Sequence, residues 1–306
     1  MIENRNWTPG DPSSLIGKRA LVTGANTGLG FEIAKELAAK GAEVIMACRN
    51  NHKAHEAKSK ILQDFPNAKL HVLEIDLASL ESVRKFAAQF NLEYNSLDIL
   101  INNGGVMMPP YTITKDGFEL QFETNYLSHF LLTGLLMRKL EASPSPRVIS
   151  ISSLAHDWGD IYFDDLNFQT KYDKRKAYGQ SKLACLMFAY ELDRRLRQKN
   201  SPIKSLAAHP GISATDHSRY LPWLIRFLSP VLVPLVAQSA NEGAQPILRA
   251  ALDHTLPGGT YIGPDGKDGY KGKPVKVDSN EISKNEAVAT RLWELSEQLT
   301  GVSFLD

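Results

Sequence analysis

The 306-residue sequence is poor in cysteine and almost balanced in charge. Its two cysteines, Cys48 and Cys185, stand far apart and without the spacing of metal ligands, which is unlike a disulfide scaffold and favours two ordinary buried thiols in a reducing compartment. With 35 basic and 34 acidic residues, the formal net charge is +1, and no strongly basic surface is predicted. We therefore expect no nucleic-acid partner.

Long uninterrupted apolar runs are also scarce. Residues 1–15 are polar and lack the apolar core of a secretory signal, so we interpret them as an N-terminal extension and expect a cytoplasmic protein. The most apolar stretch, 220–237, contains Arg226 and three prolines, which divide it into pieces too short to cross a membrane as one helix. We expect no stable membrane span, and we interpret this stretch as a cover over a substrate.

Short β-favouring apolar runs alternate with longer helical patterns along the chain. Strands are predicted at 19–23, 43–48, 69–75, 97–102, 147–152, 204–208 and, more weakly, 260–262. The stretch LGFEIAKELAAKG is typical of the helices, because Ile33, Leu37 and Ala38 form an apolar stripe and Gly41 marks a stop. The alternation predicts an α/β fold, with one doubly wound, Rossmann-like parallel sheet, helices on both faces, and a single domain over 16–306.

The segment TGANTGLG, at 23–30, follows the first predicted strand and opens the first predicted helix. Gly24, Gly28 and Gly30 permit a tight turn and close approach of the backbone to a pyrophosphate, and the start of the helix offers free N–H groups. The spacing is GxxxGxG rather than GxGxxG, and the glycines alone also fit a plain turn. Between a strand and a helix, they predict a phosphate-binding loop.

The end of the second predicted strand, VIMACRNN, indicates which dinucleotide would bind. Folds that prefer NAD usually place an acidic residue there, which binds the ribose hydroxyls. This chain has Cys48 followed by Arg49, whose guanidinium can hold a 2′-phosphate with two hydrogen bonds. We expect NADP(H) as the cofactor; the alternative is that Arg49 is simply a solvated side chain.

Tyr178 and Lys182, in AYGQSK, are four residues apart at the start of a long predicted helix and so share one helix face. A phenol ordinarily titrates near pH ~10, so an ammonium group that stabilises the phenolate helps it to act as an acid or base at neutral pH. An exposed pair without any function has the same spacing. The pair therefore needs support from the other motifs.

Taken together with NNGG at 102–105, TNYLSHFLLT from 124, RVISISS from 147 and HPG at 209, these motifs resemble the short-chain dehydrogenase/reductase family over nearly the whole chain. The chain is most similar to retinol dehydrogenases and related bacterial oxidoreductases, and IMACRN and DLASLESVR also resemble light-dependent protochlorophyllide reductase. The resemblance implies NADP(H)-dependent interconversion of a hydrophobic alcohol and its aldehyde or ketone. Reduction of a C=C bond in a pigment-like substrate and a non-catalytic NADP(H) sensor are the alternatives, and a homo-oligomer is left open.

The resemblance implies that Tyr178 exchanges a proton with the substrate oxygen and that Ser153, rather than Ser152, hydrogen-bonds that oxygen. Lys182 would hold the nicotinamide ribose and stabilise the phenolate, and Asn125 would anchor a water molecule that links the lysine to solvent. The catalytic residues are thus Asn125, Ser153, Tyr178 and Lys182. The expected cofactor-binding residues are Gly24, Asn26, Thr27, Gly28, Leu29, Gly30, Arg49, Asp76, Leu77, Asn102, Asn103, Gly104, Tyr178, Lys182, Pro210, Gly211, Ile212 and Thr215.

The substrate side of such a fold is formed by loops after the later strands, here 105–115 and about 154–176 and 213–238. An apolar cover is predicted from Met107, Met108, Tyr111, Trp158, Tyr220, Trp223 and Phe227, although each of these residues taken alone could be plain core. His156 and the acidic residues after it, in HDWGDIYFDD, match no metal-binding loop. We expect a solvated loop there and no metal.

Overall fold

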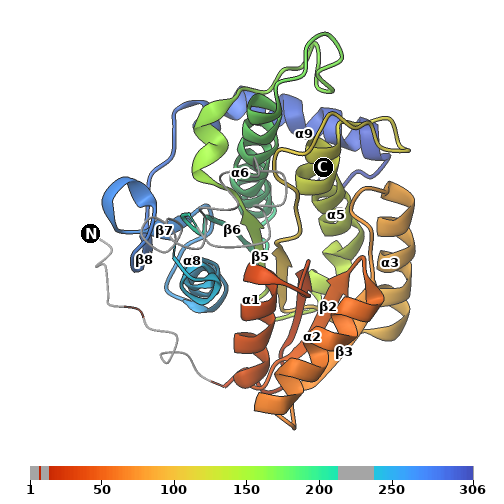
Figure 1. Ribbon diagram of the computed structural model, residues 1–306, viewed down its shortest axis with the longest axis vertical. Helices are drawn as coiled ribbons and strands as arrows, with labels where there is room; N and C mark the ends of the chain where they lie inside the picture. The colour runs from red at the N-terminus through yellow and green to blue at the C-terminus, as the bar shows by residue number, and fades with distance from the viewer. Residues whose placement is uncertain (1–6, 8–13, 213–237, 306) are drawn as a thin grey trace.

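The computed structural model describes residue 7 and residues 14–212 and 238–305, and a single sheet runs through the described residues (Figure 1). Its eight strands are β1 (Arg19–Thr23), β2 (Glu43–Cys48), β3 (Lys69–Glu74), β4 (Ile99–Asn102), β5 (Arg147–Ile151), β6 (Lys204–Ala208), β7 (Tyr261–Pro264) and β8 (Pro274–Lys276). The strand order is β3-β2-β1-β4-β5-β6-β7-β8, and every neighbouring pair is parallel except β7 and β8.

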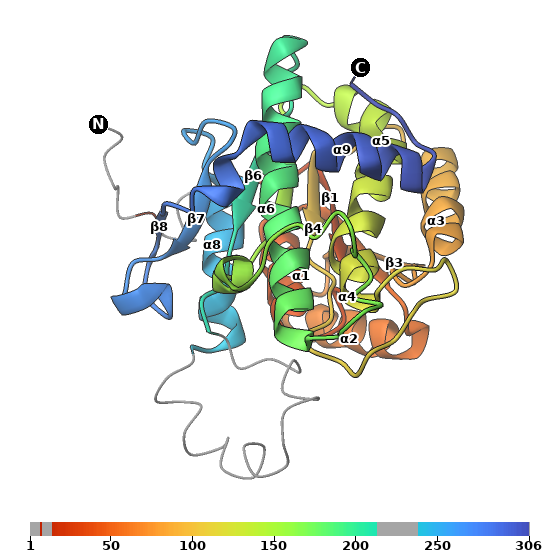
Figure 2. The same cartoon turned by 90° about the horizontal axis from the view of Figure 1, so that it is seen from above.

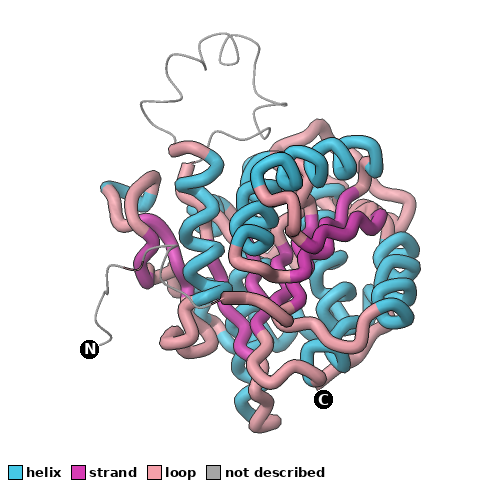
Figure 3. Tube along the Cα trace, turned by 90° about the horizontal axis from the view of Figure 1, so that it is seen from below, coloured by secondary structure: helices cyan, strands magenta, loops and turns pink. Residues whose placement is uncertain are grey.

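Helices cover both faces of this sheet (Figures 2 and 3). On one face, α1 (Gly28–Ala39), α2 (Asn51–Asp64) and α8 (Ala240–Leu252) pack around a core that includes Ile33 and Ile247. On the other face, α3 (Leu80–Glu93), α5 (Ser128–Glu141), α6 (Lys174–Gln198) and α9 (Glu286–Thr300) surround an aromatic core that includes Phe130 and Trp293. The predicted doubly wound, Rossmann-like α/β fold is confirmed.

Short helical turns join several of these elements. A three-residue helix α4 (Leu120–Phe122) continues directly into a π-helix, η1 (Glu123–Leu127), and then into α5. All five residues of the π-helix are buried. The 3₁₀ turn η2 (Leu154–Trp158) follows β5, and the turns η4 (Lys267–Gly269) and η5 (Ile282–Lys284) flank β8. π-Helical turns often occur at functional sites, so η1 indicates that a functional site lies nearby.

Most strand boundaries agree with the prediction, and β1, β2 and β6 agree to the residue. The predicted stripe on α1 is buried, and Gly41 has the left-handed φ of +90° expected of a helix stop. The antiparallel edge strand β8 was not predicted, because it has only three residues and begins with a proline. The domain boundary at residue 16 stays a prediction.

The strand order changes direction at β1, which lies between β2 and β4. In open α/β sheets, such a switch point leaves a crevice at the carboxyl ends of the strands, where ligands bind. None of the helices within 14–212 and 238–305 combines the length and hydrophobicity needed to cross a membrane. The apolar stretch 220–237 lies outside the described residues.

Candidate active site

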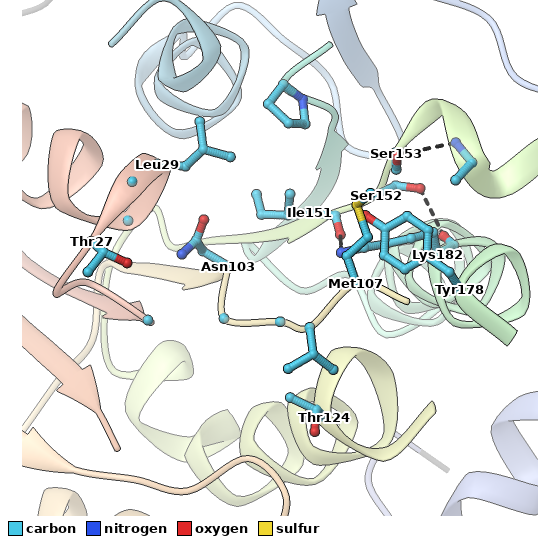
Figure 4. Close-up of a pocket in the computed structure, with 18 of the residues that line it drawn as sticks. Thr27, Leu29, Asn103, Met107, Thr124, Ile151, Ser152, Ser153, Tyr178 and Lys182 are labelled. Carbon is cyan, nitrogen blue, oxygen red and sulfur yellow. Dashed lines mark hydrogen bonds between the residues drawn. The ribbon is translucent and has the colours of Figure 1, made fainter. Parts of the chain in front are cut away.

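A cavity of about 630 Å³ opens at the carboxyl ends of the central strands, and Figure 4 shows part of its lining. Tyr178, Lys182 and Ser153 lie at one end of the view, and Thr27, Leu29 and other residues of the glycine segment lie at the other. The structure therefore brings both predicted groups to one cavity. The predicted residues that line it are Gly24, Asn26, Thr27, Gly28, Leu29, Gly30, Arg49, Asp76, Asn103, Gly104, Ser153, Tyr178, Lys182, Pro210, Gly211 and Ile212.

The glycine segment leaves no room for side chains where it meets its neighbours. Gly24 and Gly28 have left-handed φ values of +68° and +54°. A Cβ atom on Gly30 would lie 2.2 Å from the carbonyl oxygen of Gly24, and one on Gly24 would lie 2.9 Å from the Cα atom of Gly104. Helix α1 starts here, and the side chain of Thr27 caps none of its N–H groups. This start of a helix fits the pyrophosphate of a dinucleotide.

Two basic side chains line the cavity near the end of β2. Arg49 lies 3.9 Å from the carboxylate of Asp76, and about two thirds of its side chain is exposed. Lys53, in the first turn of α2, also lines the cavity and was missed from the sequence, because Arg49 precedes the helix and no helical spacing relates the two side chains. Asp76 can balance only one of these two positive charges, so one positive charge is left to bind a 2′-phosphate.

Neither cysteine is among the residues that line this cavity. Cys48 and Cys185 are both buried and free, as expected. Burial raises the pKa of Cys48 to about 12, although the backbone of Ala25 and Asn26 opposes this rise. The position at the end of β2 that holds an acid in NAD-preferring folds is thus a neutral thiol.

Tyr178 and Lys182 lie one turn apart on α6 and are both almost completely buried. The Lys182 Nζ atom lies 5.8 Å from the centre of the Tyr178 ring and donates a hydrogen bond to the carbonyl oxygen of Ile151 at 3.1 Å. The Tyr178 hydroxyl forms no hydrogen bond with the described residues and lines the cavity. A substrate oxygen in the cavity could therefore pair with it.

The two serines after β5 differ in what their hydroxyl groups bind (Figure 4). The Ser152 hydroxyl donates to the carbonyl oxygen of Lys182 at 2.8 Å. The Ser153 hydroxyl oxygen accepts from the backbone N–H of Ala155 at 3.2 Å, and among the described residues its own proton has no acceptor. Ser153 is therefore the serine with a proton to donate into the cavity.

Three predicted residues lie behind the cavity wall instead of lining it. Asn125 hydrogen-bonds the backbone of Val106, Asn102 donates to Thr133, and Leu77 approaches Gly104 so closely that a Cβ there would lie 2.6 Å from its Cδ1 atom. The cavity wall here is the segment 103–106. Asn125 and Leu77 contact this segment, and Asn102 directly precedes it in the chain. Thr215 lies outside the described residues.

The predicted apolar cover is only partly seen. Met107 and Trp158 line the cavity, whereas Tyr111 packs on Tyr172 with a ring separation of 4.9 Å and Met108 lies away from the lining. Tyr220, Trp223 and Phe227 lie outside the described residues. Leu154, at the start of the predicted substrate loop 154–176, also lines the cavity. Leu120, Thr124 and Tyr270 line it too and were missed, because they come from distant segments with no shared local pattern.

The loop after β5 corrects one expectation. His156 is buried rather than solvated, and its Nδ1 atom lies 2.7 Å from the carbonyl oxygen of Ser153. The acidic residues behave as expected: Asp157 is exposed, and the Asp165 carboxylate accepts from the N–H groups of Gln169 and Thr170. In the described parts of the chain, no three His, Cys, Asp or Glu side chains are grouped to hold a metal ion.

The model of the short chain dehydrogenase family matches residues 18–222, which cover both the glycine segment and the Tyr178–Lys182 pair. The chain belongs to the short-chain dehydrogenase family. It is 43% identical to human retinol dehydrogenase 13 over 297 residues, 95% of this chain and 86% of the relative. It is 38% identical to human polyprenol dehydrogenase over 289 residues, 92% of this chain and 85% of the relative. The protein is thus an oxidoreductase similar to the retinol dehydrogenases.

A solved structure supports the same relationship. A crystal structure of a protein from Mycobacterium Paratuberculosis is 40% identical in sequence, with a TM-score of 0.82, and the match covers 97% of this chain and 98% of that one. Since the match includes nearly every residue of both chains, the short-chain dehydrogenase fold extends over the strands and helices described above.

Proposed function

We propose that the protein interconverts a hydrophobic alcohol and its aldehyde or ketone with NADP(H). The observation that carries this proposal is the convergence of Ser153, Tyr178 and Lys182 on the same cavity as the glycine segment. The uncapped start of α1 fits a dinucleotide phosphate, and the absence of side chains at Gly24 and Gly30 lets the turn pack closely enough to present it. When bound, NADP(H) supplies or accepts the hydride.

In this proposal, the Tyr178 hydroxyl gives its proton to the substrate oxygen during reduction and takes it back during oxidation. The Ser153 hydroxyl donates a hydrogen bond to that oxygen and stabilises its developing negative charge. The Lys182 ammonium, 5.8 Å from the Tyr178 ring, stabilises the phenolate electrostatically. Asn125 contributes by position, because its side chain holds the backbone of Val106 in the cavity wall.

The substrate class is inferred from the lining and from the relatives. Met107, Leu120, Leu154 and Trp158 give the cavity apolar surface near Tyr178, and the Trp158 and Tyr178 rings are 6.3 Å apart. Two relatives are named for retinol and for a polyprenol, which are apolar alcohols. We therefore propose an apolar alcohol or carbonyl compound as substrate.

The experiment is a panel of lipophilic aldehydes, ketones and alcohols followed by NADPH absorbance, with Tyr178→Phe as the test variant. Removing only the hydroxyl should lower turnover by about 10²- to 10⁴-fold, the usual contribution of a positioned acid or base, while NADPH still binds. Tyr190→Phe is the matched control, since its hydroxyl lies further along α6 and bonds Ser279. Full activity of Tyr178→Phe would show that the proton comes from elsewhere.

The preference for NADP(H) is tested by titrating NADPH and NADH against tryptophan fluorescence. A charge-assisted hydrogen bond contributes about 1.5–3 kcal/mol, so Arg49→Ala should weaken NADPH binding by about tenfold or more and leave NADH binding unchanged. Lys53→Ala should act in the same direction, more weakly, because a lysine binds as a point charge. Lys60→Ala, on an exposed part of α2, is the control. Equal loss for both cofactors would contradict the proposed role of Arg49.

A further inference from the structure

His129, on α5, is enclosed between two segments that reach the cavity. It is 3% exposed, and both of its ring nitrogens are hydrogen-bonded. The Nε2 atom lies 2.9 Å from the hydroxyl oxygen of Thr23, at the end of β1. The Nδ1 atom lies 2.8 Å from the carbonyl oxygen of Asn125, in the π-helix. One imidazole thus joins the end of the first strand to the turn that carries Asn125.

The direction of both hydrogen bonds follows from their chemistry. A carbonyl oxygen can only accept, so Nδ1 carries the hydrogen that bonds Asn125. Burial lowers the pKa of His129 to about 4, despite the opposing bond to Asn125 and with help from the Lys182 ammonium, so the ring is neutral at neutral pH. Its Nε2 atom then has no hydrogen and must accept from the Thr23 hydroxyl.

The Thr23 hydroxyl, which is hydrogen-bonded to His129, also binds the backbone on the cofactor side of the cavity. Its hydroxyl oxygen accepts from the backbone N–H groups of Asn103 and Gly104 at 2.9 and 2.8 Å. Both residues line the cavity. The hydroxyl has one proton to donate, and His129 Nε2 at 2.9 Å is a closer acceptor than the Ile101 carbonyl oxygen at 3.4 Å. The imidazole therefore fixes the hydroxyl that holds the wall at 103–104.

Asn125, whose carbonyl oxygen is hydrogen-bonded to His129, binds residues on the side of the cavity with Tyr178 and Lys182. Its side chain accepts from the N–H of Val106 at 2.8 Å and donates to the Val106 carbonyl at 3.0 Å and to the Ser181 hydroxyl at 2.9 Å. Ser181 lies between Tyr178 and Lys182 on α6 and donates back to the Tyr178 carbonyl at 2.8 Å. The backbone position of Asn125 therefore bears on both proposed catalytic side chains.

We propose that His129 is a positioning residue that holds the cofactor wall and the catalytic helix in one geometry through two separate hydrogen bonds. The bond to Thr23 serves cofactor binding, and the bond to Asn125 serves the proton-transfer residues. The inference rests on the proposed function and deepens it, because it assigns a role to a residue that touches neither cofactor nor substrate.

Two conservative variants separate the bonds. In His129→Asn, the amide nitrogen takes the place of Nδ1 and can still donate to Asn125, but the side chain is too short for Thr23. In His129→Gln, the amide oxygen takes the place of Nε2 and can accept from Thr23, but the N–H donor to the Asn125 carbonyl oxygen is lost, which leaves that oxygen only the weaker thiol donor Cys185 at 3.2 Å among side chains. Each variant thus keeps one bond and loses the other.

The NADPH dissociation constant is measured by tryptophan fluorescence, and kcat is measured at saturating NADPH on an apolar aldehyde from the panel. Losing one of these buried hydrogen bonds should cost about 5- to 20-fold, because the Thr23 hydroxyl then has only the longer bond to the Ile101 carbonyl and the Asn125 carbonyl only the weak thiol donor Cys185 among side chains. His129→Asn should raise the NADPH Kd by that factor and keep kcat within about twofold, and His129→Gln should lower kcat by that factor and keep the Kd within about twofold. Leu136→Ala, fully buried on α5, is the control for general loosening of the helix.

The crossed pattern supports the proposal, since a purely structural histidine would change both quantities in step with thermal stability. The proposal is overturned if both variants leave Kd and kcat unchanged, or if both quantities change together as they do in Leu136→Ala. A failure of the proposed function can be distinguished from a failure of this inference, because in that case the wild-type protein itself would neither bind NADPH nor turn over any substrate of the panel. That result would also remove the inference that depends on it.

Discussion

Glu123 is a fully buried carboxylate in the π-helix, two residues before Asn125. One of its oxygens accepts from the hydroxyl of Thr114, and the other has no hydrogen-bond partner among the described residues. Burial raises the pKa of Glu123 to about 8; the bond to Thr114 opposes the rise, and the carboxylates of Asp116 and Asp76 add to it. The native protein should therefore hold a proton on Glu123 at neutral pH.

This pKa makes stability depend on pH with a definite sign. A glutamate in an unfolded chain titrates near ~4.3, so the two states differ in proton binding between about pH 4.3 and 8. The contribution to stability is complete below that window, falls as the pH rises through it, and is lost above pH 8. The pKa difference of about 3.7 corresponds to at most about 5 kcal/mol, and relaxation around the buried charge should reduce this to about 2–4 kcal/mol.

Glu123→Gln removes the ionisation and keeps the shape, and the amide can donate a hydrogen bond as the protonated carboxyl does. The free energy of unfolding in urea should exceed that of the wild type by at most about 1 kcal/mol at pH 5 and by about 2–4 kcal/mol at pH 9. Glu294→Gln, an exposed position on α9, is the control and should show no such difference. A difference between variant and wild type that stays constant from pH 5 to 9 would refute the reasoning.

Two further predictions concern packing. Gly30→Ala places a Cβ atom 2.2 Å from the carbonyl oxygen of Gly24, so it should cost about 1–3 kcal/mol and weaken NADPH binding in a fluorescence titration, whereas Gly134→Ala meets the side chains of Phe304 and Val302, which do not line the cavity, and should keep binding intact whatever it costs in stability. Phe130→Ala empties a fully buried site whose ring lies 5.0 Å from that of Trp293, and urea unfolding should show a loss of about 3–5 kcal/mol; a loss below about 1 kcal/mol would mean that the site collapses.

The sequence by itself determined the elements whose signals are local. Parallel strands buried on both faces are continuous apolar runs, which is why β1, β2 and β6 were predicted to the residue. The glycine segment lies within one turn between β1 and α1, so its order in the sequence already predicts a binding loop. Tyr178 and Lys182 lie four residues apart on one helix, so their spacing already places their side chains together. No such rule applies to β8, whose pairing depends on β7 alone.

Only the tertiary structure decided which distant residues meet. Asn125, whose place on a proton path stays a prediction, holds the backbone of Val106 in the cavity wall, a contact between segments that no local pattern indicates. Thr23 and His129 are 106 residues apart in the chain and become partners because α5 packs beside the ends of β1 and β4. Local patterns carry no information on such a pair, since its hydrogen bond forms only after the sheet and both helical layers have assembled.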